Sequence, residues 1–217
     1  MRRPDPVPKT LRTLLGRLVE AGATEGFYLA GGTGLALRLH HRQSVDLDFF
    51  SRTNHLDGME RQALQRRLRH LPGWAVVEAK DGTLHGRVGR TRVSFFWYDP
   101  PLLKSVTTPG PMPIASLEDI GLMKLGAIIG RGSRKDFVDL YVICQRVPLR
   151  RLLALGPRKF KDSRDFTLQA LKALTYFRDA EQEPPIVAIP PVSWEQIKTF
   201  FTREVRALAQ PLMKPML

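Results

Sequence analysis

Two aspartates one residue apart, Asp46 and Asp48, stand inside the apolar run SVDLDFF. Alternate residues of a strand point to opposite faces, so both carboxylates share one face while Val45, Leu47 and Phe49 share the other. Their Cα atoms would then be about 6.5–7 Å apart, near enough for both carboxylates to hold a divalent cation. A strand face that is merely solvated is the competing interpretation.

A glycine pair, Gly31 and Gly32, falls between an expected strand and an expected helix ahead of these aspartates. A backbone without Cβ atoms lets a phosphate approach closely. The helix that follows offers free N–H groups and the positive end of its dipole to an anion. Thr33 adds a hydroxyl donor, and Ser44 stands where a second hydroxyl could touch phosphate. The combination predicts a phosphate cradle beside a metal-binding carboxylate pair.

The apolar periodicity predicts an α+β chain, with a mixed sheet in the front half and helices behind it. Strands are expected at residues 26–31, 44–50, 74–79, 83–88 and 91–98. Helices are expected at residues 9–21, 32–41, 54–73, 117–130, 134–145, 148–156, 163–177 and 193–209. Proline-rich connectors cover residues 100–113 and 183–191.

The stretch YLAGGTGLALRLHHRQSVDLDFF, residues 28–50, resembles the signature of nucleotidyltransferases with the polymerase-β-like fold. It is most similar to the AbiEii/AbiGii family, the toxin half of bacterial toxin–antitoxin and abortive-infection pairs. The resemblance extends from about Phe27 to Ile143, where LMKLGAIIGRGSRKDFVDLYVI matches the family's second characteristic segment. It implies a polymerase-β-like core with a mixed sheet in residues 1–110 and a helical C-terminal domain in residues 111–217.

The same resemblance implies Mg²⁺-dependent transfer of a nucleotidyl group from a nucleoside triphosphate, with tRNA as the acceptor for some members, and a possible cognate antitoxin. It also implies residue roles: a metal pair (Asp46, Asp48), a triphosphate cradle (Gly31, Gly32, Thr33, with Ser44 beside it), a lysine (Lys124) and two further acidic positions (Asp136, Asp139). Many polymerase-β-like enzymes carry a third carboxylate on a later strand. Here Ser94 stands at that place, and Asp99 lies further along the same strand.

Lys124 lies on the apolar stripe of its expected helix and is the only charge between Ile120 and Gly130. It is either a lysine that extends from the helix edge to water or an ammonium directed at the triphosphate. Asp136 and Asp139, three residues apart, share a helix face. They either form an ion network with nearby basic residues, or orient Lys124 or act as a base on the incoming hydroxyl.

The formal net charge of +13 favours a polyanionic partner over a purely solubilising surface. Basic residues concentrate between Arg146 and Arg164. Such a run is often only a solvated helix face, but beside a nucleotidyl-transfer site it predicts contact with an RNA backbone. The residues expected to make this contact are Arg150, Arg151, Arg158 and Lys159.

A single cysteine, Cys144, allows no intramolecular disulfide, and no apolar run is long enough to span a membrane. We therefore expect a cytoplasmic protein without a membrane partner. The interpretation is an RNA-modifying nucleotidyltransferase, with tRNA as the expected acceptor. Two alternatives stay open: an enzyme that modifies a protein or a small molecule, as antibiotic nucleotidyltransferases do, and a catalytically silent module that binds nucleotide or RNA.

Overall fold

The chain forms two compact units, Met1–Ser116 and Leu117–Leu217, and the computed structural model describes residues 5–108 and 110–213 of them. The boundary predicted after residue 110, between the nucleotidyltransferase core and the helical C-terminal domain, stays a prediction. The elements of the first unit are α1 (Lys9–Glu20), β1 (Tyr28–Leu29), α2 (Gly31–Leu39), β2 (Leu47–Ser51), α3 (Gly58–Leu68), β3 (Trp74–Lys80), β4 (Thr83–Val88) and β5 (Thr91–Trp97). Those of the second are α4 (Leu117–Gly130), α5 (Arg134–Cys144), α6 (Leu149–Lys159), α7 (Phe166–Ala173), α8 (Arg178–Glu181) and α9 (Trp194–Met213).

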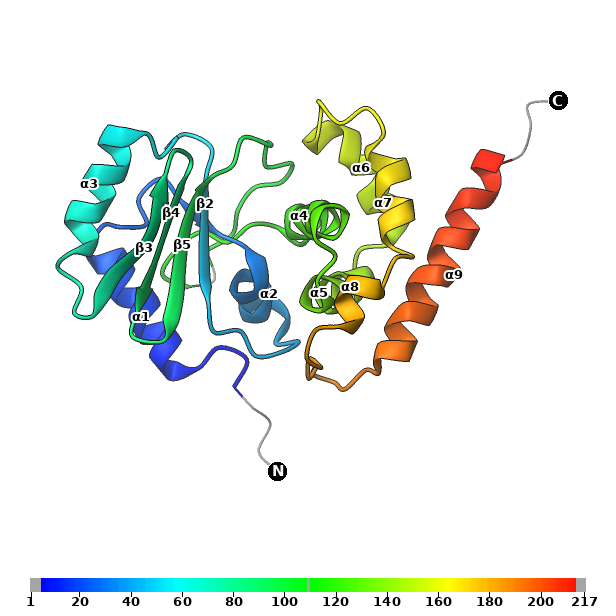
Figure 1. Cartoon of the computed structure of the whole chain (residues 1–217), viewed down its shortest axis with the longest axis horizontal. Coiled ribbons are helices and arrows are strands. Elements are labelled where there is room, and N and C mark those ends of the chain that lie inside the picture. Colours follow the sequence, from blue (N-terminus) through cyan, green and yellow to red (C-terminus); the bar gives the residue numbers. More distant parts are fainter. Residues whose placement is uncertain (1–4, 109, 214–217) are drawn as a thin grey trace. The chain divides into compact units, whose positions relative to one another are not determined.

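The strands of the first unit make a mixed sheet in the order β1-β2-β5-β4-β3, which confirms the predicted fold class (Figure 1). β2 pairs with β1 in antiparallel fashion and with β5 in parallel fashion. β5, β4 and β3 follow as an antiparallel meander. The parallel pairing joins strands that are distant in sequence, because α3, β3 and β4 lie between β2 and β5 along the chain.

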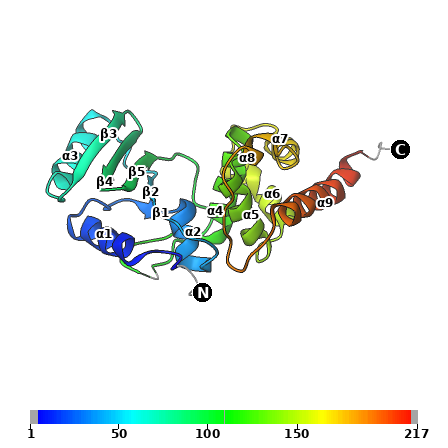
Figure 2. The ribbon, with the colours of Figure 1, turned by 60° about the horizontal axis from the view of Figure 1, so that its bottom comes forward.

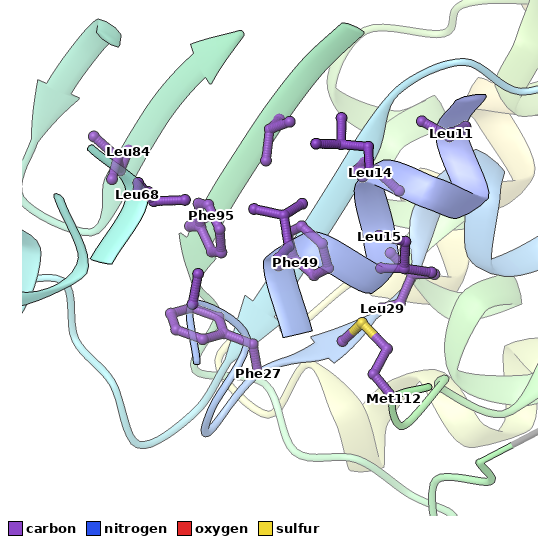
Figure 3. Packing of buried hydrophobic residues seen from close by; sticks show 14 of the residues in the cluster. Leu11, Leu14, Leu15, Phe27, Leu29, Phe49, Leu68, Leu84, Phe95 and Met112 are labelled. Atoms are coloured by element: carbon purple, nitrogen blue, oxygen red, sulfur yellow. The ribbon is translucent and has the colours of Figure 1, made fainter. Parts of the chain in front are cut away.

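One face of this sheet carries the apolar core of the unit, which α1 and α3 cover. The leucines Leu11, Leu14, Leu15 and Leu18 recur at helical spacing and form the buried stripe of α1. They join Leu64 and Leu68 of α3 in one cluster with alternate residues of the strands, Leu47, Phe49, Leu84, Val93 and Phe95. Figure 3 shows leucines of α1 gathered with the rings of Phe49 and Phe95, whose centroids lie 4.9 Å apart.

The second unit is entirely helical over its described residues, as predicted (Figure 2). Its core includes Phe137 of α5, whose ring contacts Phe177, Trp194 and Phe201. The helix predicted over residues 163–177 is shorter in the structure: α7 covers Phe166–Ala173, and a turn at residues 174–175 ends it before the short α8 begins at Arg178. Within residues 5–108 and 110–213, no helix has the length and apolar character that crossing a membrane requires.

Candidate active site

The α2 helix begins at the predicted glycine pair. Gly31 has a φ of +62°, in the left-handed region that favours glycine. A Cβ atom on Gly31 would lie 2.8 Å from Oδ2 of Asp48, which is closer than van der Waals contact allows. Glycine is therefore required at this position by the backbone conformation and by the carboxylate that packs against it. The Asp48 side chain thus occupies the space that a side chain at position 31 would need.

Gly32 faces two polar side chains from the segment before β2. A Cβ atom on Gly32 would lie 2.6 Å from Nη2 of Arg42 and 3.0 Å from Oγ of Ser44. Both Arg42 and Ser44 are buried. The N-cap residue of α2 is Ala30, whose side chain makes no capping hydrogen bond, and the N-terminus of the helix carries a partial positive charge. A guanidinium, a hydroxyl and a helix N-terminus thus converge on the glycine pair.

Thr33 holds the start of α2 against the segment that leads into β2. Its hydroxyl lies 2.8 Å from Oγ of Ser44 and also contacts the backbone oxygen of Asp46. Ser44 Oγ and the Asp46 carbonyl oxygen are both acceptors for the single hydroxyl hydrogen of Thr33. The Thr33 hydroxyl is therefore used inside the protein, where it positions Ser44 and Asp46. Ser44 is the hydroxyl that faces Gly32.

The aspartate pair lies at the start of β2. Leu47 and Phe49 are buried in the core, and Asp48 points to the other face, as alternation predicts. The expectation that Val45 joins the core face is wrong: Val45 is 54% exposed, because the strand begins at Leu47. Asp46 directly precedes the strand, and its side chain, 31% exposed, accepts a hydrogen bond of 3.0 Å from the exposed Arg92.

Ser94 of β5 is the Cα partner of Asp48 across the parallel pairing of β2 and β5. The position next to Asp48 on the neighbouring strand thus carries a buried hydroxyl and no carboxylate. Asp99 comes after the end of β5 and is exposed. The register therefore supports Ser94, rather than Asp99, as the counterpart of a later-strand carboxylate.

A second acidic pair lies in the helical unit, where Asp136 and Asp139 of α5 are completely buried. Nζ of Lys124 lies 2.9 Å from Oδ1 of Asp136 and 2.6 Å from Oδ2 of Asp139. Arg131 and Ser133 donate further hydrogen bonds to Asp136, at 2.9 and 2.7 Å. Lys124 is buried as its apolar stripe predicts, and its ammonium is paired inside the protein rather than extended to water.

The Asp136 carboxylate is kept charged inside the protein. Burial acts to raise its pKa, but the Lys124 charge and the hydrogen bonds from Arg131 and Ser133 act the other way, and the net pKa lies below the ordinary value. Asp136 therefore stays ionised at neutral pH. In this cluster the positive charges of Lys124 and Arg131 oppose the negative charges of Asp136 and Asp139.

The basic segment expected to contact RNA divides into two kinds of residue. Arg150, Arg151 and Arg158 are exposed, and Arg151 makes an ion pair of 3.2 Å with Glu118. The expectation for Lys159 is wrong: it is 1% exposed, and its Nζ donates to Oδ1 of Asp119 at 2.9 Å. Packing of α6 on α4 brings these opposite charges together inside the core, so Lys159 offers no surface to RNA.

Comparisons with known proteins place this site in a family. A family model described as "Nucleotidyl transferase AbiEii toxin, Type IV TA system" matches residues 13–100, which include the glycine pair, Asp46 and Asp48. An uncharacterized protein of Aquifex aeolicus, aq_aa25, is 34% identical over 202 residues, covering 91% of this chain and 95% of that protein. The chain belongs to the AbiEii nucleotidyltransferase toxin family. Membership makes it a nucleotidyltransferase with a nucleotide substrate and implies a cognate antitoxin.

Solved structures share the fold of this AbiEii-family protein at low sequence identity. MenT4, a nucleotidyltransferase toxin from Mycobacterium tuberculosis, superposes with a TM-score of 0.56 at 15% identity, covering 95% of this chain and 86% of MenT4. ANT(2'')-Ia, crystallised with adenylyl-2''-tobramycin, superposes with a TM-score of 0.55 at 17% identity, covering 71% of this chain and 99% of ANT(2'')-Ia. Both confirm the nucleotidyltransferase fold.

The oxygen ligands in the AbiEii site suit a small hard cation bound together with a substrate. Among the described residues, no group of three or more histidine, cysteine or acidic side chains could hold a metal ion by itself. Asp46 and Asp48 supply carboxylate oxygens only. Mg²⁺ is commonly bound in this way, through one or two carboxylates together with substrate phosphates and water. The donor set therefore fits Mg²⁺ in the presence of a triphosphate.

Sequence reasoning missed Arg42 and Arg92. Arg42 stands between the glycine helix and the aspartates, and its place two residues before Ser44 could have signalled a phosphate contact. Arg92 lies far from Asp46 in sequence, and only the pairing of β2 with β5 brings them together. The ion network with nearby basic residues, one of the two interpretations of Asp136 and Asp139, includes the ion pair of Arg131 with Asp136, five residues later.

Proposed function

We propose that this protein transfers a nucleotidyl group from a nucleoside triphosphate to RNA, with tRNA as the acceptor, in a Mg²⁺-dependent reaction. The observation that carries the proposal is the surroundings of the glycine pair. The Asp48 side chain lies against Gly31, and the side chains of Arg42 and Ser44 lie against Gly32. A phosphate site beside a carboxylate pair suits a triphosphate whose charge is shared between the protein and a cation.

The triphosphate cradle consists of the N–H groups at Gly31 and Gly32, the Ser44 hydroxyl and the Arg42 guanidinium. The N-terminal end of α2 contributes a partial positive charge. Arg42 adds a full charge and a planar fork of donors, which matches phosphate geometry. Thr33 acts on this cradle indirectly, because its hydroxyl positions Ser44 and the backbone of Asp46.

Asp46 and Asp48 hold the cation in this proposal. Mg²⁺ held by these two carboxylates would supply positive charge that stabilises the negative charge of the triphosphate. Arg92 occupies one oxygen of Asp46 in the structure. Exposed ion pairs of this kind contribute little to stability, so a divalent cation can displace the guanidinium at low cost.

Lys124, Asp136 and Asp139 act as one unit in this proposal. Both aspartates are buried, which makes them poor candidates for a base on an incoming hydroxyl and good candidates for orienting Lys124. The contacts of Lys124 with both carboxylates support that role. The proposed task of the Lys124 ammonium is to stabilise negative charge on the triphosphate.

RNA as acceptor is supported by the net charge of +13 and by the exposed arginines Arg150, Arg151 and Arg158. Arginine and lysine side chains that neutralise phosphates provide most sequence-independent affinity for nucleic acid. ANT(2'')-Ia, whose crystal contains an adenylylated aminoglycoside, shows the same fold. A small cationic acceptor is the second candidate, but the basic character of this chain disfavours it.

Incubation with each labelled nucleoside triphosphate, total RNA and Mg²⁺ tests the proposal, with the labelled product then separated into RNA, protein and small-molecule fractions. We expect label in RNA, and in the tRNA size range within it. Label in a protein or small molecule would redirect the acceptor assignment. Metal-dependent triphosphate binding without transfer would support the catalytically silent alternative.

A further inference from the structure

A row of polar side chains crosses the sheet from Asp48. Asp48 of β2 is paired with Ser94 of β5, Ser94 with His85 of β4, and His85 with Glu78 of β3. Residues directly opposite each other on neighbouring strands point to the same face of a sheet. Asp48, Ser94, His85 and Glu78 therefore form one line on the face that points away from the α1–α3 core.

Side-chain contacts on either side of this row confirm the shared face. Arg92 of β5 reaches Asp46 on one side. On the other side, the ring of Phe96 packs edge-on against His85, with the ring centroids 5.2 Å apart. The same ring stacks on Phe50, with the centroids 5.1 Å apart. The intervening strand residues belong to the core on the opposite face.

A β-bulge brings Glu78 into the row. The pairing of β3 with β4 shifts between Val76 and Glu78, so that Glu78, rather than Val77, stands opposite His85. Bulges occur often beside active sites, where they redirect a side chain. Nε2 of His85 lies 3.8 Å from Oε2 of Glu78, and the His85 side chain is 26% exposed. The imidazole is thus partly open to solvent, with a carboxylate beside it.

The other charged groups near His85 come from the same three strands. Lys80 of β3 lies 2.8 Å from Glu78, while Arg87 of β4 and Arg92 of β5 are paired one position along the same face. A hydrogen bond and charge from Lys80, with a smaller contribution from His85, hold the pKa of Glu78 below its ordinary value. Glu78 is therefore ionised at neutral pH and can stabilise a protonated imidazole.

We propose that His85 accepts the proton of the acceptor hydroxyl, in place of the strand carboxylate that Ser94 lacks. The inference rests on the proposed nucleotidyl transfer and deepens it. The hydroxyl oxygen forms a bond to the α-phosphorus while its proton passes to Nδ1 of His85, the ring nitrogen that has no hydrogen-bond partner among the described residues, since Nε2 faces Glu78. The bond from the α-phosphorus to the bridging oxygen breaks, and its electron pair leaves with pyrophosphate.

The spacing of the row suits this role. Two strand separations put the Cα atoms of Asp48 and His85 about 9–10 Å apart. Ser94, between them, is buried and carries a hydroxyl where an aspartate would carry a carboxylate. The acceptor hydroxyl would lie between the proposed cation site at Asp48 and the imidazole, with Glu78 as a positioning residue behind His85. Imidazole is the side chain best suited to accept a proton near neutral pH.

The test compares pH–rate profiles of transfer for the wild type, His85→Gln, Glu78→Gln and the double variant His85→Gln/Ser94→Asp. We expect the wild-type rate to fall as the pH drops, because a general base must be unprotonated to accept a proton. His85→Gln should slow transfer on the order of 100-fold and remove that acid limb. Glu78→Gln should slow it by about tenfold, since Glu78 acts only through His85.

The double variant is the decisive measurement, because it restores a carboxylate beside Asp48. We expect it to recover at least about tenfold of the lost rate, with an acid limb near pH 4–5 where carboxylates titrate. The matched control is His70→Gln, which changes an exposed histidine after α3 and should behave as the wild type. Metal-dependent triphosphate binding should be the same in all of these proteins.

The outcomes separate this inference from the function on which it rests. A wild type that transfers nucleotide, with His85→Gln keeping the same rate and pH profile, would overturn the role of His85 alone. If His85→Gln loses its fold, a normal profile in Glu78→Gln would overturn the proposed arrangement. A wild type that neither binds triphosphate nor transfers nucleotide to any acceptor would overturn both proposals.

Discussion

The two acidic pairs of this molecule have the same composition and opposite surroundings. Asp46 and Asp48 lie at the start of a strand, partly exposed, and Asp46 forms an ion pair with the solvent-exposed Arg92. Asp136 and Asp139 lie in a helix, fully buried, with the ammonium of Lys124 within 2.9 Å of both. In the proposed function the first pair takes a cation from solution, whereas the second pair holds the ammonium of Lys124.

This difference shows that burial decides what a carboxylate pair can do. Buried charges are tolerated only when internal partners compensate for lost hydration, so the second pair must be satisfied by the fold itself. A partly exposed pair keeps contact with water and can exchange it for a metal ion and phosphate oxygens. The difference in burial supports the proposed metal-binding role of Asp46 and Asp48. It supports a structural role for Asp136 and Asp139, in which they orient Lys124.

The largest expected effect follows removal of one charge from the exposed pair. Asp46→Asn or Asp48→Asn should reduce transfer on the order of 1,000-fold or more, because each amide is a poor ligand for Mg²⁺. The melting temperature without metal should stay the same or rise slightly, since two like charges repel each other. Transfer rates and thermal unfolding of the same preparations test this.

Asp99→Asn is the matched control, since it changes an exposed aspartate beyond the end of β5. It should keep normal transfer. Near-normal transfer by either Asp46→Asn or Asp48→Asn would show that the metal assignment is wrong, and a large loss in Asp99→Asn would show that a further carboxylate takes part.

The buried pair should respond in stability first. Lys124→Met preserves the apolar stem and leaves two buried carboxylates short of a counter-charge, which should cost about 3–5 kcal/mol of unfolding free energy. Adding Asp136→Asn and Asp139→Asn to Lys124→Met should recover at least half of that loss, because the uncompensated charges disappear. Chemical denaturation at pH 7 measures both effects. Triphosphate affinity, measured on variants that stay folded, tests the proposed role of the ammonium.

The pH dependence of stability sharpens the same point. The pKa of Asp136 is lower in the folded protein than its ordinary value. Its contribution to stability is therefore fully present above the unfolded-state pKa of about 3.9 and is lost as the pH falls through the lower folded-state pKa. The acid limb of the stability curve should be shallower in Asp136→Asn. An unchanged limb would mean that the cluster does not hold Asp136 ionised.

Two adjacent basic residues offer a smaller version of the comparison. Lys159→Met breaks the buried pair with Asp119 and should cost about 3 kcal/mol. Arg158→Met changes an exposed neighbour and should stay within about 0.5 kcal/mol of the wild type. Equilibrium denaturation of the two variants compares them directly. Equal losses would contradict the burial of Lys159.

The smallest expected effect concerns the exposed arginines. Replacing Arg150 and Arg158 by Gln should lower the salt dependence of RNA binding by about 0.7–0.9 in the log–log slope for each lost phosphate contact. Triphosphate binding should be unchanged. Arg206→Gln, an exposed charge on α9, serves as the control for net charge alone. An RNA affinity that does not depend on salt in any variant would remove the RNA part of the proposed function.

Local pattern was sufficient to predict much of this protein. Alternation along SVDLDFF put Asp48 opposite Leu47 and Phe49, because a strand has a period of two whatever surrounds it. Helical spacing placed Lys124 on a buried stripe, and the glycine pair marked the start of α2. These features depend on a few neighbouring residues, so they are present in the sequence itself.

The tertiary structure alone decided which charges are internal and which residues become neighbours. Lys159 belongs by sequence to a basic surface run, and only the packing of α6 on α4 supplies Asp119, forty residues earlier, as its buried partner. Likewise, the row from Asp48 to Glu78 exists because β5 pairs in parallel with β2 and a bulge shifts β3. Strand pairing and helix packing minimise the free energy of the whole chain, and a local pattern of residues does not contain that information.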